Sequence, residues 1–305
     1  MMQAINFLQF ASKLTKGSDD IILLDVVIDS RKIQSGSKML FVALNGSRYS
    51  GWEFAEDAYS KGVRNFILPE DCPDPILKSL EQANILLSPS PLRELQKLAK
   101  LNRENFAGPV IGITGSNGKT IVKEWLAQVL SSKYHVWKSP KSYNSQIGVA
   151  LSSLGISQQH QVAVLEAGIS APNEMNALAQ IIQPQLGIFT NIGSAHDEYF
   201  LDSTAKISEK CLLFKNVKYL IYRKDQSLLS QYLEKNFDPS VLVSWSDEPG
   251  GDYVLSVKPH NNGSKIFLIG NDFQTHTFIT PFKDQASLEN VRHVITAALS
   301  LGMKP

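Results

Sequence analysis

Residues 110–130 read VIGITGSNGKTIVKEWLAQVL, and this stretch decides the fold. The apolar run at 110–114 is typical of a buried parallel strand. A glycine-rich turn follows at 115–120, and residues 119–131 then continue with helical spacing. The apolar residues expected on one face of this helix are Ile121, Val122, Trp125, Leu126, Val129 and Leu130. A strand, a glycine-rich turn and a helix in this order form the context in which a phosphate-binding loop occurs.

The turn itself carries groups suited to nucleotide phosphates. Its glycines let backbone N–H groups point inward, and the helix N-terminus adds partial positive charge. Lys119 is expected to reach the terminal phosphates of ATP, and the Thr120 hydroxyl is expected to bind Mg²⁺. The residues expected to bind the nucleotide in this loop are Gly115, Ser116, Asn117, Gly118, Lys119 and Thr120. The general pattern places a glycine where this chain has Ile113, so a tight turn with a surface lysine stays the alternative.

Strand and helix patterns alternate beyond the loop. Strands are expected at 162–166, 186–190 and 219–222, with helices starting at 172 and 203 between them. This order predicts a mostly parallel sheet covered by helices. Short alternating runs between 241 and 280 predict an antiparallel extension of the same domain, and a last helix is expected at about 287–301.

The first part of the chain mixes short strands and helices up to a linker near residues 105–109. A length of 305 residues suits about two domains. We therefore expect an α/β protein: a small N-terminal α/β domain at 1–106 and a phosphate-loop domain at 107–305.

Polar side chains follow the expected parallel strands, where ligands gather in an open sheet. Glu166 ends one strand and could bind Mg²⁺, although a solvated carboxylate is the alternative. Asn191 and His196 follow the next strand. A lone histidine is more often a structural hydrogen-bonding group than a ligand. Lys210 lies on the next expected helix, and neither the local composition nor its spacing from other residues distinguishes it from a surface lysine.

Composition excludes several classes of protein. The net charge is +1, so no basic field attracts nucleic acid or a membrane surface. The two cysteines, Cys72 and Cys211, form neither metal-type spacing nor a disulfide framework. The N-terminus lacks the pattern of a signal peptide, and no apolar stretch is long enough for a membrane span. We expect a cytoplasmic protein without nucleic-acid partners.

Taken together, these segments resemble the Mur ligase family, ATP-dependent enzymes that add amino acids to the peptide of the bacterial cell-wall precursor. The resemblance rests on GITGSNGKT (112–120), SYNSQIGVAL (142–151), LEAG (165–168), TNIGSAHDEYF (190–200) and EKCLLF (209–214). DSRKIQSGSKMLFVALNGSRYSGWEF at 29–54 is similar to the family's substrate-nucleotide domain. The resemblance covers nearly the whole chain.

The resemblance implies roles for individual residues. Lys119 and Thr120 match the ATP-phosphate and magnesium positions, and Glu166 and His196 match magnesium ligands. Lys210 matches a lysine that family members carry as a carbamate, made with carbon dioxide, which turns a cation into an anionic oxygen ligand. Lys119, His196 and Lys210 are thus the implied catalytic residues.

Four further positions have implied binding roles. Asn144 matches a position near the substrate and the terminal phosphate. Asn290 matches an asparagine that contacts adenine, but Glu289 stands where family members often have histidine. Ser30 and Arg31 match a region that binds the UDP moiety.

Within the family the sequence looks most like the enzyme that joins D-alanyl-D-alanine to UDP-N-acetylmuramoyl-tripeptide. SYNSQIG and SLENVRH suggest the version fused to alanine racemase. A third, C-terminal domain is expected after residue 305, so we interpret the chain as truncated and inactive alone in the ligation. The alternatives are a ligase of the folylpolyglutamate synthase type, a non-catalytic nucleotide-binding module and, less favoured, a phosphate-loop kinase.

Overall fold

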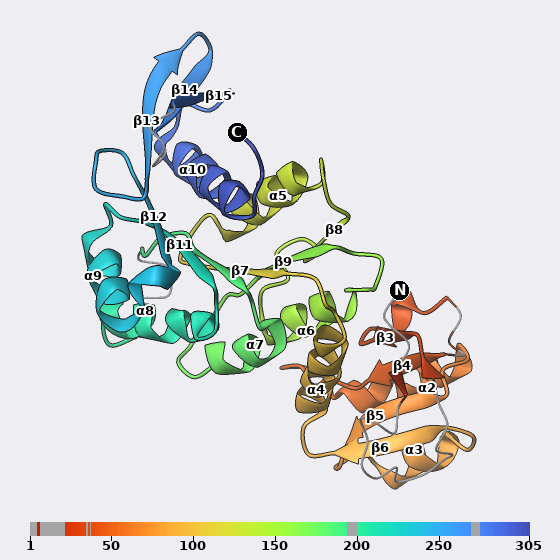
Figure 1. Ribbon diagram of the computed structural model, residues 1–305. Coiled ribbons are helices and arrows are strands. Elements are labelled where there is room, and N and C mark those ends of the chain that lie inside the picture. Colours follow the sequence, from red (N-terminus) through yellow and green to blue (C-terminus); the bar gives the residue numbers. More distant parts are fainter. Residues whose placement is uncertain (1–4, 7–21, 35, 37, 194–199, 270–274) are drawn as a thin grey trace. The chain divides into compact units, whose positions relative to one another are not determined.

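The computed structural model describes residues 5–6, 22–34, 36, 38–193, 200–269 and 275–305 (Figure 1). The chain forms two compact units. The first comprises Met1–Ala107 and Ala150–Gln158, and the second comprises Gly108–Val149 and Gln159–Pro305. Asn102 helps to attach residues 150–158 to the first unit, because its buried side-chain amide donates to the carbonyls of Ser153 (2.8 Å) and Ile156 (3.0 Å).

The first unit contains a four-stranded parallel sheet in the order β3-β4-β5-β6. Its strands are β3 (Asp25–Val27), β4 (Met39–Val42), β5 (Asn65–Pro69) and β6 (Asn84–Ser88). Its helices are η1 (Ser30–Lys32), η2 (Gly51–Phe54), α2 (Ala55–Ser60), α3 (Asp74–Ser79) and α4 (Pro91–Glu104). Two further short strands, β1 (Ile5–Asn6) and β2 (Ile22–Leu23), pair antiparallel. All five residues of β5 are buried, as expected for a central strand covered on both faces.

The second unit is built on a nine-stranded sheet in the order β15-β14-β13-β12-β11-β10-β7-β9-β8. Its strands are β7 (Val110–Thr114), β8 (Val136–Lys138), β9 (Val162–Glu166), β10 (Leu186–Phe189), β11 (Tyr219–Arg223), β12 (Leu242–Ser246), β13 (Tyr253–His260), β14 (Gly263–Ile269) and β15 (Thr275–Thr280). Pairing is parallel from β8 to β13 and antiparallel from β13 to β15. The α/β class, the mostly parallel sheet and the antiparallel extension are confirmed.

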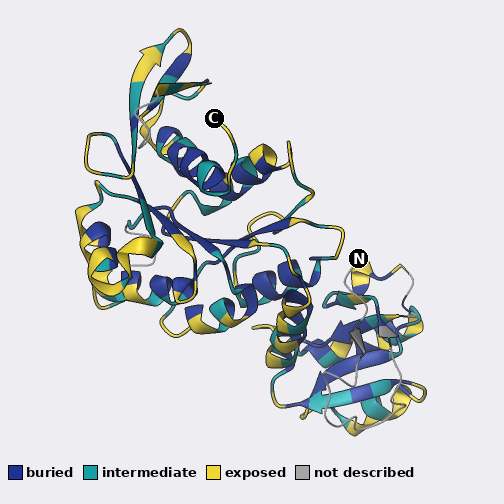
Figure 2. Cartoon of the chain, viewed as in Figure 1, coloured by how far each residue is buried: buried dark blue, intermediate teal, exposed yellow. Residues whose placement is uncertain are grey.

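Helices cover the parallel part of this sheet. They are α5 (Lys119–Leu130), α7 (Met175–Ile182), α8 (Ser203–Cys211), η4 (Leu212–Phe214), α9 (Ser227–Asn236), η5 (Pro239–Val241) and α10 (Gln285–Ser300). Helix α6 (Gln146–Leu154) is divided between the two units at Ala150. Helices α5 and α10 lie together on one face, and α7 and α8 lie on the other (Figure 1). The central strands between these layers are buried throughout (Figure 2). Polar groups at the ends of these strands are therefore held on a rigid frame.

The apolar face predicted for α5 is buried only in part. Val122, Leu126 and Leu130 are buried in the core, but Ile121 and Val129 remain exposed. Successive positions in an α-helix are about 100° apart, so a face six residues wide is too broad to be covered by one sheet. No helix in the described ranges is long and apolar enough to cross a membrane.

Candidate functional site: a phosphate loop at the sheet edge

The glycine-rich loop joins β7 to α5, and at Gly115 and Gly118 it approaches neighbouring segments too closely for a side chain. Gly115 has φ +142°, and a Cβ there would clash with Thr190 Oγ1. Gly118 has φ +81° at the N-cap of α5, and a Cβ there would clash with Asn290 Oδ1. Left-handed backbone and close approach both require glycine. Asn290 is thus placed directly against the loop.

Two lysine side chains contact this loop, and a third binds Gly193, whose N–H donates to Ser116 Oγ of the loop. Lys119 Nζ donates to the carbonyl oxygens of Gly115 (2.9 Å) and Ser116 (3.0 Å). Lys210 Nζ donates to the Gly115 carbonyl at 3.2 Å, and Lys206 Nζ donates to the Gly193 carbonyl at 2.6 Å. The loop is therefore lined by several positive charges, an arrangement suited to a polyphosphate.

Burial and mutual repulsion change the acidity of these lysines. Burial lowers the pKa of Lys119. Burial, with repulsion from Lys119 and Lys206, lowers the pKa of Lys210 to about 7. Lys210 is 2% exposed, which corrects the interpretation of it as a surface lysine. A lysine with a pKa near neutrality is partly an uncharged amine, the form that reacts with carbon dioxide.

Glu166 ends β9 close to Thr120 and is completely buried. Neither carboxylate oxygen has a hydrogen-bond partner within the described part of the chain. Burial raises the pKa of Glu166, and nearby Lys123, Thr120 and Lys119 oppose the rise. A buried carboxylate whose two oxygens accept no hydrogen bond from the described residues fits a hard divalent cation, which would bind to those oxygens.

The metal set is incomplete in the residues that can be described. These residues contain no group of three or more histidine, cysteine, aspartate or glutamate side chains that could hold a metal ion. His196 lies outside the described ranges, and Lys210 would become an oxygen ligand only as a carbamate. The Thr120 hydroxyl donates to Ser142 Oγ at 3.5 Å, and Thr120 is also among the groups that counteract the raised pKa of Glu166.

Asn144 also reaches this edge of the sheet. Its backbone carbonyl accepts from the Gly168 N–H at 2.9 Å, and a Cβ on Gly168 would lie 3.0 Å from Asn144 Cγ. The structure thus brings Asn144 beside the segment that follows Glu166. Loop, Glu166, Lys210, Asn144 and Asn290 all belong to the second unit.

Ser30 and Arg31 belong to the first unit, where they begin η1. Ser30 is 2% exposed, and its carbonyl accepts from Lys61 Nζ at 3.1 Å. Asp29 caps this turn through the Arg31 N–H and pairs with Arg31 Nε at 2.9 Å. Hydrogen bonds from Arg31 lower the pKa of Asp29 to about 2.

Two lysines of this edge were missed in the sequence. Lys123 is fully buried, 4.0 Å from Glu166 Oε2, and donates to the Lys141 carbonyl. Lys206 is 1% exposed. Each lies four residues from a predicted site lysine, Lys119 or Lys210, so i,i+4 spacing on the same helix was the available signal.

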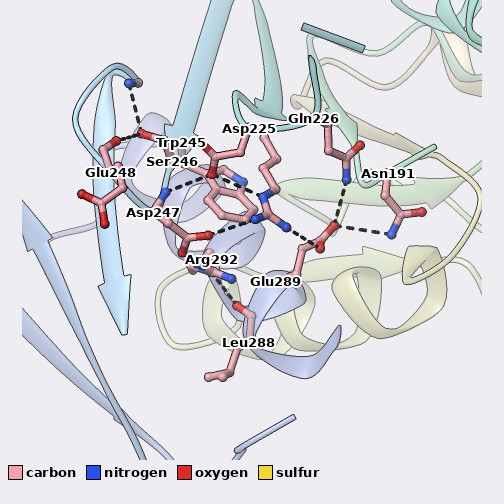
Figure 3. A network of polar contacts seen from close by, with 12 residues as sticks. Asn191, Asp225, Gln226, Trp245, Ser246, Asp247, Glu248, Leu288, Glu289 and Arg292 are labelled. Atoms are coloured by element: carbon pink, nitrogen blue, oxygen red, sulfur yellow. Dashed lines mark hydrogen bonds and ion pairs between the residues drawn. The ribbon is translucent and has the colours of Figure 1, made fainter. Parts of the chain in front are cut away.

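A network of charged and amide side chains lies beside the loop at the ends of β10, β11 and β12 (Figure 3). Its members, called the Glu289 network below, are Asn191, Arg223, Asp225, Gln226, Asp247, Glu289 and Arg292. Arg223 binds Glu289 at 3.1 Å and Asp247 at 2.9 Å. Glu289, which stands where family members often have histidine, is therefore held in this network by an ion pair with Arg223 and by two side-chain amides.

Fold and loop together define an α/β protein of the phosphate-loop class. Residues 113–298 match the model of the Mur ligase middle domain. The chain belongs to the Mur ligase family.

Relatives extend the similarity to most of the chain. The UDP-N-acetylmuramoyl-tripeptide–D-alanyl-D-alanine ligase of Bacillus subtilis is 30% identical over 292 residues, which cover 94% of this chain and 61% of that protein. MurF ligase from Thermotoga maritima, solved in complex with ADP, is 27% identical with a TM-score of 0.79, over 92% of this chain and 64% of that one. MurF from Acinetobacter baumannii shares the fold, with a TM-score of 0.87 at 22% identity over 99% of this chain and 66% of that one. The chain thus spans less than two thirds of the length of these relatives.

Proposed function

We propose that this chain supplies the nucleotide- and acceptor-binding parts of an ATP-dependent ligase that joins D-alanyl-D-alanine to UDP-N-acetylmuramoyl-tripeptide in peptidoglycan precursor synthesis. The observation that carries the proposal is the match over 94% of the chain to an enzyme with that name. The lysine-lined loop and the buried Glu166 carboxylate, whose oxygens lack hydrogen-bond partners within the described residues, support it, because they suit a nucleoside triphosphate with a divalent cation.

The reaction has two steps. The terminal carboxylate of the acceptor attacks the γ-phosphorus of ATP, an O–P bond forms, and ADP leaves with the bridging oxygen. The amine of D-alanyl-D-alanine then attacks the acyl phosphate carbon, a C–N bond forms, and phosphate leaves as the amine loses a proton. Negative charge grows on the transferring oxygens, so positioning and positive charge are the main contributions expected of the protein.

Lys119 is assigned to the β- and γ-phosphates, since its Nζ already lies among the loop carbonyls. Magnesium, when bound, would neutralise phosphate charge; its proposed ligands are Thr120, Glu166, His196 and a carbamylated Lys210. Asn144 is assigned to the acceptor and the terminal phosphate, and Asn290 to adenine.

Domain roles follow the same division. Residues 1–106 would bind the UDP moiety, with Ser30 and Arg31 in that site, and residues 107–305 would bind ATP. The relatives are longer than this chain, so the complete ligation is assigned to a longer protein that includes a C-terminal domain. The proposed fusion to alanine racemase is tested by the gene sequence beyond codon 305.

Two alternatives remain to be distinguished by experiment. A ligase of the folylpolyglutamate synthase type would use a different acceptor. A non-catalytic nucleotide-binding module would bind ATP without turnover. The coverage of the N-terminal unit by the Bacillus relative favours the peptidoglycan acceptor.

The test uses the full-length protein with ATP, Mg²⁺, UDP-N-acetylmuramoyl-tripeptide and D-alanyl-D-alanine. Phosphate release that requires both the tripeptide and the dipeptide is expected. Release with a folate acceptor instead would favour the first alternative, and ATP binding without release would favour the second. Calorimetry on the 305-residue chain, with Lys119→Ala as control, tests nucleotide binding separately.

A further inference from the structure

Glu289, near the start of α10, lies between two side-chain amides (Figure 3). Its Oε1 accepts from Gln226 Nε2 at 3.2 Å and from Asn191 Nδ2 at 3.5 Å. Its Oε2 accepts from Arg223 Nη1 at 3.1 Å. The Glu289 carboxylate thus contacts one residue that follows β10 and one that follows β11, and both are more than sixty positions from Glu289 in the sequence.

A carboxylate can only accept hydrogen bonds, whereas an amide has a donating and an accepting end. The NH₂ groups of Asn191 and Gln226 must therefore face Glu289, and their oxygens must point away from it. Asn191 Oδ1 accepts from the Asn117 N–H at 3.0 Å. Gln226 Oε1 accepts from the Ile192 N–H at 3.3 Å. Rotating either amide by half a turn would point its NH₂ group at the backbone N–H of Asn117 or Ile192, and two donors cannot bond to each other.

The Asn191 side-chain oxygen binds the phosphate loop, and the Gln226 side-chain oxygen binds the segment that contacts the loop. The backbone carbonyl of Asn191 also accepts from the Ser116 N–H at 2.9 Å, so Asn191 binds two successive N–H groups of the loop. Thr190 Oγ1 donates to the Asn117 carbonyl at 2.6 Å. The conformation of the loop at 116–117 therefore depends on the placement of residues 190–192.

We infer that Glu289 is a positioning residue for the phosphate loop, acting through the fixed orientation of the Asn191 and Gln226 amides. Arg223 neutralises the Glu289 carboxylate and holds it in place through Oε2. The effect of Glu289 on ATP affinity rests on the proposed nucleotide binding. Its effect on the conformation of the loop does not, because that effect is expected in the nucleotide-free protein.

Amide hydrogen exchange, measured by NMR on the nucleotide-free 305-residue chain, tests the structural part. Glu289→Gln keeps the size of the side chain but offers one oxygen, which the Arg223 guanidinium would attract, so the new NH₂ would face the two amides. We expect exchange at Asn117 and Ile192 to accelerate by up to about tenfold, as for the loss of one hydrogen bond. Glu289→Ala should give the same result.

Asp225→Asn is the matched control, because Asp225 contacts Arg223 in the same network without touching either amide. Exchange at Asn117 and Ile192 should stay at the wild-type rate in this variant. Unchanged exchange in both Glu289 variants would overturn the inference. Equal acceleration in Asp225→Asn would also overturn it, because the effect would then belong to the network as a whole.

A double-mutant cycle tests the functional part. Glu289→Gln and Asn191→Ala should each weaken ATP binding several-fold, and the combined variant should lose less than the two effects multiplied. Multiplied losses would mean that Glu289 does not act through Asn191. If the wild-type chain binds no ATP, the proposed function fails for this chain, whereas the exchange experiment still decides the role of Glu289.

Discussion

Lys123 Nζ lies 4.0 Å from Glu166 Oε2, and both side chains are fully buried. Lys123 also donates to the Lys141 carbonyl, but Glu166 has no hydrogen-bond partner within the described ranges. The attraction between this pair offsets part of the cost of burying two charges. Removing one partner should therefore cost more than removing a surface pair.

Lys123→Met should lower the free energy of unfolding by about 3–5 kcal/mol, because it leaves the Glu166 charge without its neighbouring cation. Urea unfolding at neutral pH measures this change. Adding Glu166→Gln should recover much of the loss, since it removes the unpaired charge.

The matched control for this pair is Lys100→Met, which removes an ion pair with Glu104 whose two side chains are 45% and 43% exposed. Exposed pairs contribute about 0–1 kcal/mol. A loss in Lys123→Met no larger than in Lys100→Met would contradict a structural role for the buried pair.

Lys210 should make stability depend on pH. Its pKa falls from 10.5 to about 7 on folding, so the folded state favours the neutral amine. Stability is then fully present above pH 10.5 and decreases as the pH falls toward 7. In carbon-dioxide-free buffer, Lys210→Met should therefore gain a few kcal/mol relative to the wild type between pH 10 and pH 7. A constant difference over this range would contradict the lowered pKa.

The same amine should form a carbamate. NMR with ¹³C-labelled bicarbonate should show a carbamate signal in the wild type and none in Lys210→Met. A signal of equal intensity in both proteins would assign the carbamate to another amine.

Gly118→Ala should destabilise the protein through two separate effects. The left-handed φ of +81° costs an alanine about 1 kcal/mol, and the clash with Asn290 adds to this cost. Gly302→Ala is the control, because Gly302 has φ +74° with no atom within 4 Å of a new Cβ. Chemical unfolding should show a loss at least about 1 kcal/mol larger for Gly118→Ala. Equal losses would mean that Asn290 moves aside without cost.

His293 should make the protein sensitive to acid. The ring is fully buried, accepts from Trp245 Nε1 at Nδ1 (3.1 Å) and donates from Nε2 to the Thr190 carbonyl (2.7 Å). Burial lowers its pKa from 6.5 to about 3. The associated stability is present above pH 6.5 and is lost as the pH falls toward 3.

His293→Gln should reduce the slope of stability against pH in this interval by up to about 1.4 kcal/mol per pH unit. Unfolding curves at successive pH values measure the slope. His135→Gln, at an exposed site, serves as control. An unchanged slope in His293→Gln would show that other groups dominate the acid response.

Much of the fold could be predicted because it depends on local pattern. The apolar runs at 110–114 and 162–166 became fully buried strands, and the alternation of strands and helices predicted the parallel sheet. The loop at 115–120 was recognisable because glycine, lysine and threonine stand in a fixed order between a strand and a helix. Exposure on α5 was harder to predict, since Ile121 and Val129 are apolar but remain exposed.

The electrostatic environment of the site could not be read in the same way. In the sequence, Lys210 and Lys123 look like ordinary surface lysines, and Glu289 looks only like a departure from a pattern. Their properties depend on the groups that surround them, and pKa values change with burial and with charges brought together from distant segments.

The sequence by itself determined the α/β class and the glycine-rich loop, and it placed Glu166 at the end of a parallel strand near that loop. Only the tertiary structure decided that Lys123 is buried beside Glu166, that Asn290 touches Gly118 and that Glu289 orients Asn191 toward Asn117. The physical reason is distance. Backbone patterns act over a few residues, whereas burial, ion pairing and hydrogen-bond direction arise between residues that folding brings within a few ångströms of one another.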